Sequence, residues 1–156
     1  MGYRLKTENY KLSEIVVTPL KRINTKGGDV LHAMKKSDPE FLDFGEAYFS
    51  IIKNNSIKAW KRHKKMTLNL VVPYGKVRFV FFDNRRKSLS DESFTEVILS
   101  KENYCRITVP PLFWMGFEGQ EKGASIILNI ANILHDDQEV DRKNIDEIGY
   151  NWRNNI

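Results

Sequence analysis

The sequence contains few of the features that form covalent cross-links, zinc sites or membrane spans. Cys105 is the single cysteine among 156 residues, so neither an intrachain disulfide nor a cysteine-based zinc cluster can form. No apolar run approaches the roughly 20 residues of a membrane helix, and residues 1–10 lack the apolar core of a secretory signal. These absences predict a cytoplasmic protein that is not attached to a membrane.

The excess of positive charge is small and is concentrated in one place. Lys and Arg number 25 and Asp and Glu number 20, which gives a net charge of +5. The one dense basic run is residues 61–65 (KRHKK), and the other basic residues are dispersed. Nucleic-acid-binding surfaces more often combine a basic stripe with interleaved glycine and aromatic residues. The sequence therefore favours a small phosphate-bearing ligand and predicts no nucleic-acid partner.

Strand-like segments follow one another roughly every 8–12 residues, with turn signals between them. The clearest pair is residues 66–72 (MTLNLVV) and 77–83 (VRFVFFD), because the PYGK turn between them predicts a hairpin. This spacing predicts an all-β sandwich or barrel. The other predicted strands are residues 14–20, 30–34, 45–52, 57–60, 94–100, 104–110 and 124–132.

The rest of the chain contains no convincing helix, internal repeat or linker. Residues 84–93 predict a polar loop, and residues 135–152 predict a helical turn or a packed loop. A chain of 156 residues is long enough to bury one substantial core. We therefore expect a single domain over residues 1–156.

Four segments carry a family resemblance. They are IKAWKRHKKM (57–66), VPYGKVRFVFFD (72–83, ending in Asp83), TVPPLFWMGF (108–117) and DEIGYNW (146–152). In this order they resemble the motif segments of small cupins that act on dTDP-linked keto sugars, the dTDP-4-dehydrorhamnose 3,5-epimerases and the dTDP-4-keto-6-deoxyhexose 3,4-ketoisomerases. The resemblance spans about residues 16–152.

The resemblance implies both a fold and an activity. The fold is a cupin, or jelly-roll, antiparallel β-barrel. The activity is that of a cofactor-free isomerase or epimerase of glycan or surface-polysaccharide biosynthesis. Such an enzyme removes a proton next to the ketone of a nucleotide-linked 4-keto-6-deoxy sugar, with dTDP as the expected nucleotide. The resemblance also implies a homodimer.

The chain departs from the family at most of the positions that carry chemistry. The motif arginine is Lys58, the base histidine is Lys61, and His63 alone remains of the histidine pair. The C-terminal aspartate that orients the family's histidine has no counterpart within this sequence. Apolar residues occupy three further motif positions that are polar in the family, and these are Leu68, Met115 and Leu128.

These departures also argue against a metal centre. Metal-binding cupins bring several histidines and a carboxylate to one ion. Only His63 is available at the corresponding positions, since Leu68 and Met115 occupy ligand positions and His32 and His135 show no paired spacing with it. We therefore expect a site without metal.

His63 and Lys61 are the candidate catalytic residues. Removing a proton next to a ketone requires a base whose pKa is near 7 and a donor near the developing enolate oxygen. Histidine meets this requirement unaided, whereas Lys61 needs burial or cationic neighbours to lower its pKa; a phosphate contact is its alternative role. In an extended strand Lys61 and His63 share one face and Arg62 lies on the other.

Further residues are candidates for binding the substrate, each with a role in packing or at the surface as the alternative. Lys58 can contact a diphosphate as a point charge. Polar side chains within apolar strands require a partner, which a ligand can supply. The predicted substrate-binding residues are Lys58, Arg62, Asn69, Tyr74, Trp114 and Asn129. The apolar substitutions leave open a second function, a catalytically reduced cupin that binds a sugar nucleotide or carbohydrate without converting it.

Overall fold

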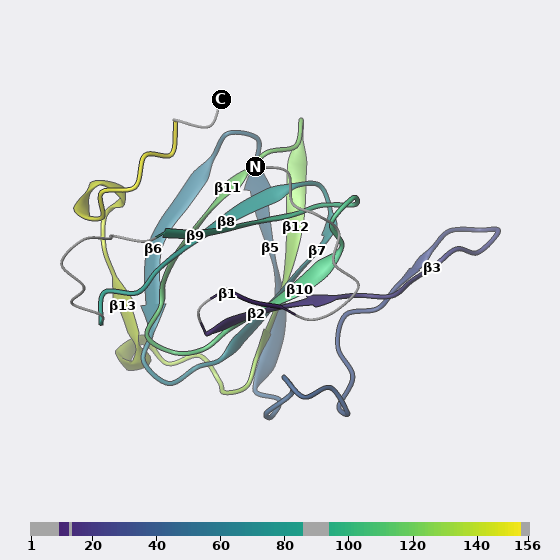
Figure 1. The fold of residues 1–156 in the computed structure, drawn as a ribbon, viewed down its shortest axis with the longest axis horizontal. Helices are drawn as coiled ribbons and strands as arrows, with labels where there is room; N and C mark the ends of the chain where they lie inside the picture. The colour runs from purple at the N-terminus through teal and green to yellow at the C-terminus, as the bar shows by residue number, and fades with distance from the viewer. Residues whose placement is uncertain (1–9, 13, 86–93, 154–156) are drawn as a thin grey trace.

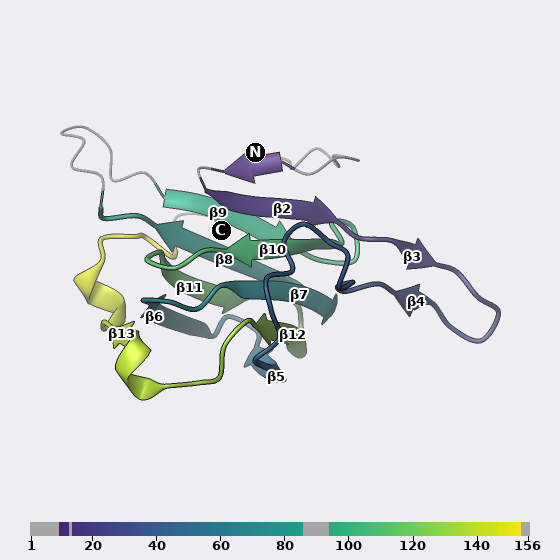
Figure 2. The ribbon, with the colours of Figure 1, turned by 90° about the horizontal axis from the view of Figure 1, so that it is seen from below.

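Antiparallel strands in two sheets make up most of the protein. The structure is a computed structural model that describes residues 10–12, 14–85 and 94–153. The two sheets lie one over the other, and a two-stranded hairpin projects from one end (Figures 1 and 2). The predicted all-β cupin jelly roll is confirmed, although the two sheets remain separate and are not closed into a continuous barrel.

The larger sheet has six strands in the order β1-β2-β10-β7-β12-β5. Residues 68–74 and 77–82 form two of the predicted strands, but they belong to different sheets and do not pair with each other, so the predicted hairpin is wrong and its tight turn instead connects the two sheets. Gly75 takes φ +93° at the turn, and a Cβ there would lie 2.2 Å from the Ser125 hydroxyl oxygen, so only glycine fits. The strands of this sheet are β1 (Tyr10–Leu12), β2 (Ile15–Pro19), β5 (Glu46–Lys53), β7 (Leu68–Tyr74), β10 (Cys105–Val109) and β12 (Ala124–Ala131).

The smaller sheet has five strands in the order β13-β6-β11-β8-β9. These strands are β6 (Ile57–His63), β8 (Val77–Phe82), β9 (Phe94–Leu99), β11 (Trp114–Gly119) and β13 (Val140–Arg142). The projecting hairpin consists of β3 (Arg22–Ile23) and β4 (Val30–Leu31), and two short 3-10 turns, η1 (Asp137–Glu139) and η2 (Ile145–Glu147), flank β13.

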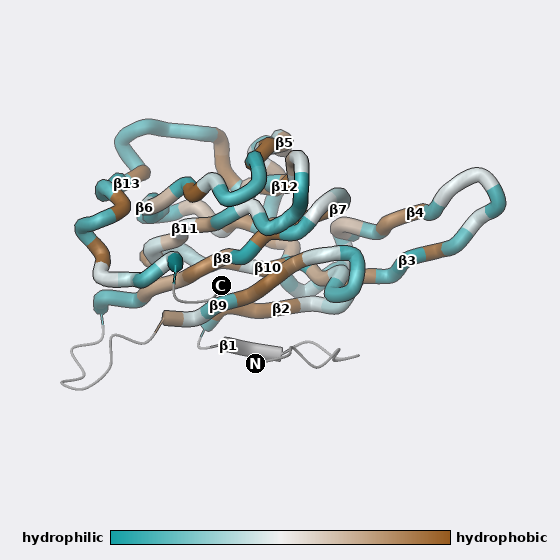
Figure 3. The backbone as a smooth tube through the Cα atoms, turned by 90° about the horizontal axis from the view of Figure 1, so that it is seen from above, coloured by the Kyte–Doolittle hydropathy of each residue, from teal (hydrophilic) through white to brown (hydrophobic). Residues whose placement is uncertain are grey.

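Apolar side chains from both sheets fill the space between them. Leu70 of β7, Phe79 of β8 and Ile107 of β10 are at most 1% exposed and belong to one cluster. Burying one such side chain stabilises the fold by about 1.5–3 kcal/mol. In Figure 3 brown stretches mark β2 and β10, whereas the tip of the β3–β4 hairpin is white and teal. The alternation of apolar and polar residues therefore directs one face of each strand into this core.

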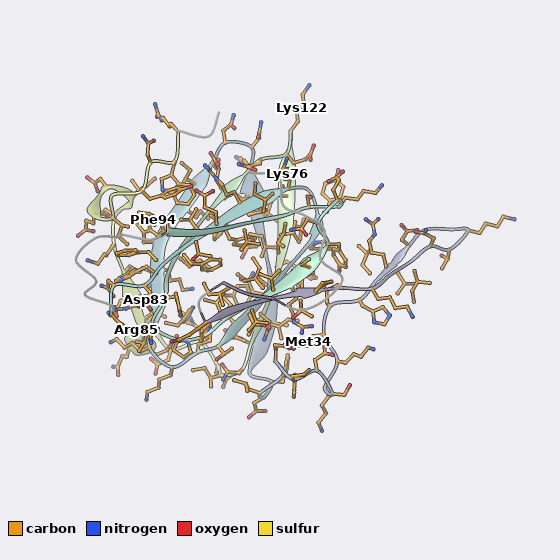
Figure 4. All side chains as sticks on the ribbon, viewed as in Figure 1. Met34, Lys76, Asp83, Arg85, Phe94 and Lys122 are labelled. Carbon is orange, nitrogen blue, oxygen red and sulfur yellow. The ribbon has the colours of Figure 1, made fainter. Side chains whose placement is uncertain are left out.

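A second cluster lies on the outer face of the smaller sheet, under the C-terminal segment. Trp60 of β6 packs there against Trp152, with ring centroids 5.4 Å apart, and Ile148 and Trp114 join them. Phe94, Asp83 and Arg85 lie on this side of the molecule, and Met34 lies on the other side (Figure 4). The C-terminal segment is thus held against β6, where it reaches one end of the space between the sheets.

The structure differs from the predicted segments in three places. Residues 135–152 contain the predicted helical turn, as η1 and η2, and in addition contribute β13, which pairs with β6. Residues 114–119 form β11, a strand that the sequence pattern did not predict. Of the predicted strand 30–34 only Val30–Leu31 is a strand. Most of the predicted polar loop 84–93 lies outside the described residues.

Candidate functional site

A cavity of about 560 Å³ opens between the sheets beside β6. Its floor is apolar and is formed by Leu68, Met115 and Phe117. Tyr48, Ser50 and Asn129 provide a polar wall from β5 and β12. The remaining side is basic and comes from β6 and the C-terminal segment. An apolar cavity with a few converging polar groups is the usual form of a small-molecule site.

The basic side of the cavity carries far more positive than negative charge. Four cationic side chains line it, and they are Lys58, Lys61, Arg142 and Lys143. Among the residues that the structure describes, Glu147 is the single carboxylate of the lining. Such an arrangement attracts an anion, and phosphate groups are the common biological anions of this size.

Lys61 is a cation of the cavity lining whose cross-strand neighbours carry no negative charge. In the strand register it lies directly opposite Arg142 on β13 and Met115 on β11. Its ammonium group makes no hydrogen bond or ion pair with any described residue. Burial lowers the pKa of Lys61 below its ordinary value and Arg142 lowers it further, against a smaller opposite effect of Glu139 and Glu46.

His63 lies two residues along the same face of β6 and is buried. Its Nδ1 is hydrogen-bonded to the Glu139 carboxylate, and its Nε2 is enclosed without a partner among the described residues. The His63 ring is not part of the cavity lining. Burial lowers the pKa of His63 and outweighs the hydrogen bond to Glu139, which acts in the opposite direction. In the uncharged ring the hydrogen bond to Glu139 requires the proton on Nδ1, which leaves Nε2 as the basic atom.

Glu139 is fixed by several donors at once. Besides His63, the backbone N–H groups of Lys65 and Met66 donate to its Oε2 at 3.1 and 3.2 Å. Burial raises the pKa of Glu139, but its hydrogen bonds to His63 and to the two backbone N–H groups outweigh this effect, so the pKa is lowered. The family's C-terminal aspartate has no counterpart in the sequence, and in the structure the carboxylate beside His63 is that of Glu139.

The polar wall faces the basic side across the cavity. Asn129 is 6% exposed and donates from Nδ2 to the Ser50 hydroxyl at 3.0 Å, which leaves its side-chain oxygen for another donor. Burial raises the pKa of Tyr48, and Glu46 adds to this effect, so the phenol keeps its proton near neutral pH. Leu128, at the motif position of the family's tyrosine, is not in the cavity lining because strand alternation turns Asn129 inward instead.

Two of the predicted substrate-binding residues lie on the outer face of the smaller sheet. Arg62 donates to the Asp141 carboxylate at 2.7 Å and lies 4.7 Å from the centre of the Trp114 ring. Trp114 is 2% exposed and belongs to the outer aromatic cluster. Neither residue lines the cavity, because alternation along β6 and β11 directs Lys61 and Met115 inward.

Asn69 and Tyr74, on β7, also lie away from the cavity. Asn69 is buried and accepts a hydrogen bond from the Thr108 hydroxyl at 2.6 Å, on the face of the sheet opposite Leu68 and Leu70. Tyr74 is 66% exposed at the turn between β7 and β8. It borders a separate hollow, which Arg22 of the β3–β4 hairpin also lines. Of the predicted site residues the structure thus brings together Lys58, Lys61 and Asn129, with His63 adjacent to them.

Sequence reasoning missed the residues that the C-terminal segment and β5 contribute. These are Glu139, Arg142, Lys143 and Tyr48. Tyr48 lies in the alternating segment 45–52, whose inward positions were recognisable by parity. No local pattern marks β13, because a strand of three residues contains too little alternation.

No group of three or more His, Cys, Asp or Glu side chains within residues 10–12, 14–85 and 94–153 is arranged to hold a metal ion. Cys105 is buried in the core, where burial raises the pKa of its thiol to about 11. In the same residues there is no helix long and apolar enough to cross a membrane.

The fold and the open cavity between its two sheets define the protein as a small cupin. No protein-family model and no curated protein matches the chain. Among solved structures it resembles a dTDP sugar isomerase from Desulfovibrio desulfuricans G20, with 33% sequence identity, a TM-score of 0.84, and coverage of 90% of this chain and 91% of that one. The chain therefore belongs to the dTDP-sugar isomerase family, as its motif segments predicted.

Two more distant structures share the fold. A dTDP-4-dehydrorhamnose 3,5-epimerase from Sulfolobus tokodaii has a TM-score of 0.79 at 20% identity, covering 92% of this chain and 85% of that one. The sugar 3,4-ketoisomerase QdtA from Thermoanaerobacterium thermosaccharolyticum, in complex with TDP, has a TM-score of 0.70 at 19% identity, with coverages of 88% and 93%. At these identities the likeness establishes the architecture.

Proposed function

We propose that this protein is a metal-free isomerase or epimerase of a nucleotide-linked 4-keto-6-deoxy sugar, with dTDP as its nucleotide, acting in glycan or surface-polysaccharide biosynthesis. The observation that carries the proposal is the end-to-end likeness to a dTDP sugar isomerase at 33% identity. The cavity supports it, because its basic side suits a diphosphate and its polar and apolar walls suit a deoxy sugar.

The diphosphate lies at the basic side of the cavity in this proposal. Arg142 offers a planar guanidinium that can bind a phosphate through two parallel hydrogen bonds, and Lys58 and Lys143 add point charges. Arg142 and Lys61 face each other directly across two strands, where like charges destabilise a sheet. A bound anion between them converts that repulsion into attraction.

The reaction starts with removal of a proton next to the C4 ketone. His63 is the proposed base, and Glu139 is a positioning residue that holds the Nδ1–H tautomer and leaves Nε2 to accept the proton. Catalytic hydrogen bonds often form only with bound substrate, so the enclosed position of Nε2 is compatible with this role. Lys61, on the same face and in the cavity lining, is the second catalytic group and meets the C4 oxygen.

The test is an NMR time course of dTDP-4-keto-6-deoxyglucose with the protein in D2O. Loss of the C3 or C5 proton signal is expected, and it identifies the carbon that is deprotonated. Asparagine in place of His63 should abolish the exchange, and exchange that survives in this variant transfers the role of base to Lys61. Line broadening of the nucleotide signals without exchange would instead make the protein a binding module.

A second copy of the chain is the proposed partner, and the outer face of the larger sheet supports this. Phe49 and Ile51 of the edge strand β5 are 68% and 62% exposed. They pair across the sheet with Leu128 and Ile126, which places four apolar side chains on one face. Light scattering after gel filtration should give the mass of a homodimer, and Phe49→Glu should shift it to that of a monomer.

Three further expectations rest on the sequence. The cytoplasmic location and the lack of a nucleic-acid partner stay predictions. A single domain over residues 1–156 also stays a prediction, which the shared core of the two sheets supports.

A further inference from the structure

Lys61 is placed as a nucleophile would be placed. The side chain lines a cavity whose floor is apolar, and no described carboxylate forms an ion pair with it. Its direct cross-strand neighbour on β13 is Arg142, a permanent cation. A buried or half-buried lysine that serves only as a fixed positive charge is normally paired with a carboxylate, and Lys61 has no such partner among the described residues.

These surroundings favour the neutral amine. Burial and the neighbouring guanidinium both lower the pKa of Lys61. A lysine amine in apolar or cationic surroundings is the form that attacks carbonyl carbons and forms Schiff bases. The proposed substrate carries a ketone, and the proposed function already places Lys61 at its oxygen.

We propose that Lys61 forms a covalent imine with the C4 carbonyl carbon of the keto sugar. This inference rests on the proposed function and specifies its chemistry. The Nζ lone pair adds to C4, the carbonyl π electrons move to oxygen, and the nitrogen, now positively charged, loses a proton while the oxygen takes one up. The resulting hydroxyl leaves as water after a second protonation, and the nitrogen lone pair forms the C=N bond of a protonated imine.

The imine makes the neighbouring C–H bond more acidic than the ketone does. His63 lies two residues along the same strand face, with Nε2 as its free basic atom. The proton passes from the carbon to Nε2, the C–H electrons form a C=C bond, and the C=N π electrons return to nitrogen. Reprotonation of the enamine on carbon and hydrolysis of the imine release the product and the amine, so no oxidant or reductant is consumed.

The experiment is reductive trapping followed by peptide mass spectrometry. The full-length protein is incubated with dTDP-4-keto-6-deoxyglucose and cyanoborohydride, which reduces a protonated imine. The expected result is a peptide containing Lys61 that gains the mass of the substrate less a single oxygen atom. Lys61→Arg should abolish the adduct, because a guanidinium stays protonated. The matched control Lys36→Arg changes an exposed turn residue outside the cavity and should leave trapping unchanged.

The outcomes separate this inference from the proposed function. Solvent exchange of the sugar protons without any adduct on Lys61 overturns the imine and leaves the isomerase standing. If the sugar shows neither exchange nor adduct, pyridoxal 5′-phosphate, a phosphate-bearing aldehyde, replaces it as the probe. Reduction should then label Lys61 at least tenfold faster than Lys58 and Lys143, and equal labelling of the three lysines overturns the inference.

Discussion

Two neighbouring residue pairs between β6 and β13 have opposite charge patterns. On the outer face Arg62 lies opposite Asp141, and the two form an ion pair at 2.7 Å. On the inner face, one residue along, Lys61 lies opposite Arg142, and neither has a carboxylate partner among the described side chains. The two pairs share the same strands and the same backbone geometry.

The difference indicates that the outer pair stabilises the fold and that the inner pair is suited to binding a ligand. Opposite charges facing each other across a sheet stabilise it, and like charges destabilise it by a similar amount. The repulsion within a like-charged pair is smallest when an anion is bound between the two cations. The outer pair holds the C-terminal segment against β6. In the proposed function the inner pair forms part of the diphosphate site.

The largest effect is expected from removing the inner lysine. Lys61→Met keeps the length of the side chain and deletes the amine, so turnover should fall by about a thousandfold. Because the repulsion from Arg142 is also removed, the free energy of unfolding should stay the same or rise by up to about 1 kcal/mol. Urea unfolding beside the NMR exchange assay measures both. A large fall in the free energy of unfolding together with the fall in turnover would refute the view that Lys61 serves activity and not stability.

Removal of the buried carboxylate should have the next largest effect. Glu139→Ala deprives His63 Nδ1 and two backbone N–H groups of their acceptor, so the free energy of unfolding should fall by about 3 kcal/mol. Glu139→Gln keeps one acceptor and should lose less. If Glu139→Gln folds stably and its activity remains low, Glu139 serves to hold the Nδ1–H tautomer of His63. Full activity in this variant would contradict that role.

The stability of the His63–Glu139 pair should depend on pH in a defined direction. Burial lowers the pKa of His63 below 6.5, so the folded state binds this proton less tightly than the unfolded chain. The corresponding stability is present above about pH 6.5 and is lost as the pH falls toward the folded pKa. Urea unfolding between about pH 7.5 and about pH 5 should show the loss in the wild type. His63→Gln should flatten this part of the curve, and an unchanged slope would exclude His63 as its source.

Removing Arg142, the other member of the inner pair, should have a smaller effect, on the affinity for dTDP. Arg142→Gln should weaken dTDP binding about tenfold, because a two-point phosphate contact is lost. The wild-type affinity should fall with rising salt more steeply than that of the variant. Calorimetric titration at two ionic strengths measures this. Equal affinities would remove Arg142 from the nucleotide site.

The outer pair should matter least. Arg62→Gln removes a partly exposed ion pair, and such pairs contribute less than about 1 kcal/mol. Binding of dTDP should be unaffected, since Arg62 does not line the cavity. A tenfold loss of dTDP affinity in this variant would return Arg62 to the substrate-binding residues.

Much of the fold was predictable because the strands are regular. The alternation in β5 and β12 and the glycine turn at Gly75 allowed these strands, the turn and the core face to be predicted from local residues. Parity along β6 also placed Lys61 and His63 on one face. The sequence does not show whether Asn69 and Trp114 face the cavity, because a polar or aromatic residue can occupy either face of a strand.

The site was predictable only in the part that a single strand supplies. The sequence by itself determined the all-β architecture, the family resemblance and the basic run from which Lys61 and His63 come. Only the tertiary structure brought Glu139 to His63 and Arg142 to Lys61, across more than 70 residues of chain. The physical reason is that strand identity is encoded in local periodicity. Which residues meet across strands depends on register, and register is decided by packing of the whole sheet.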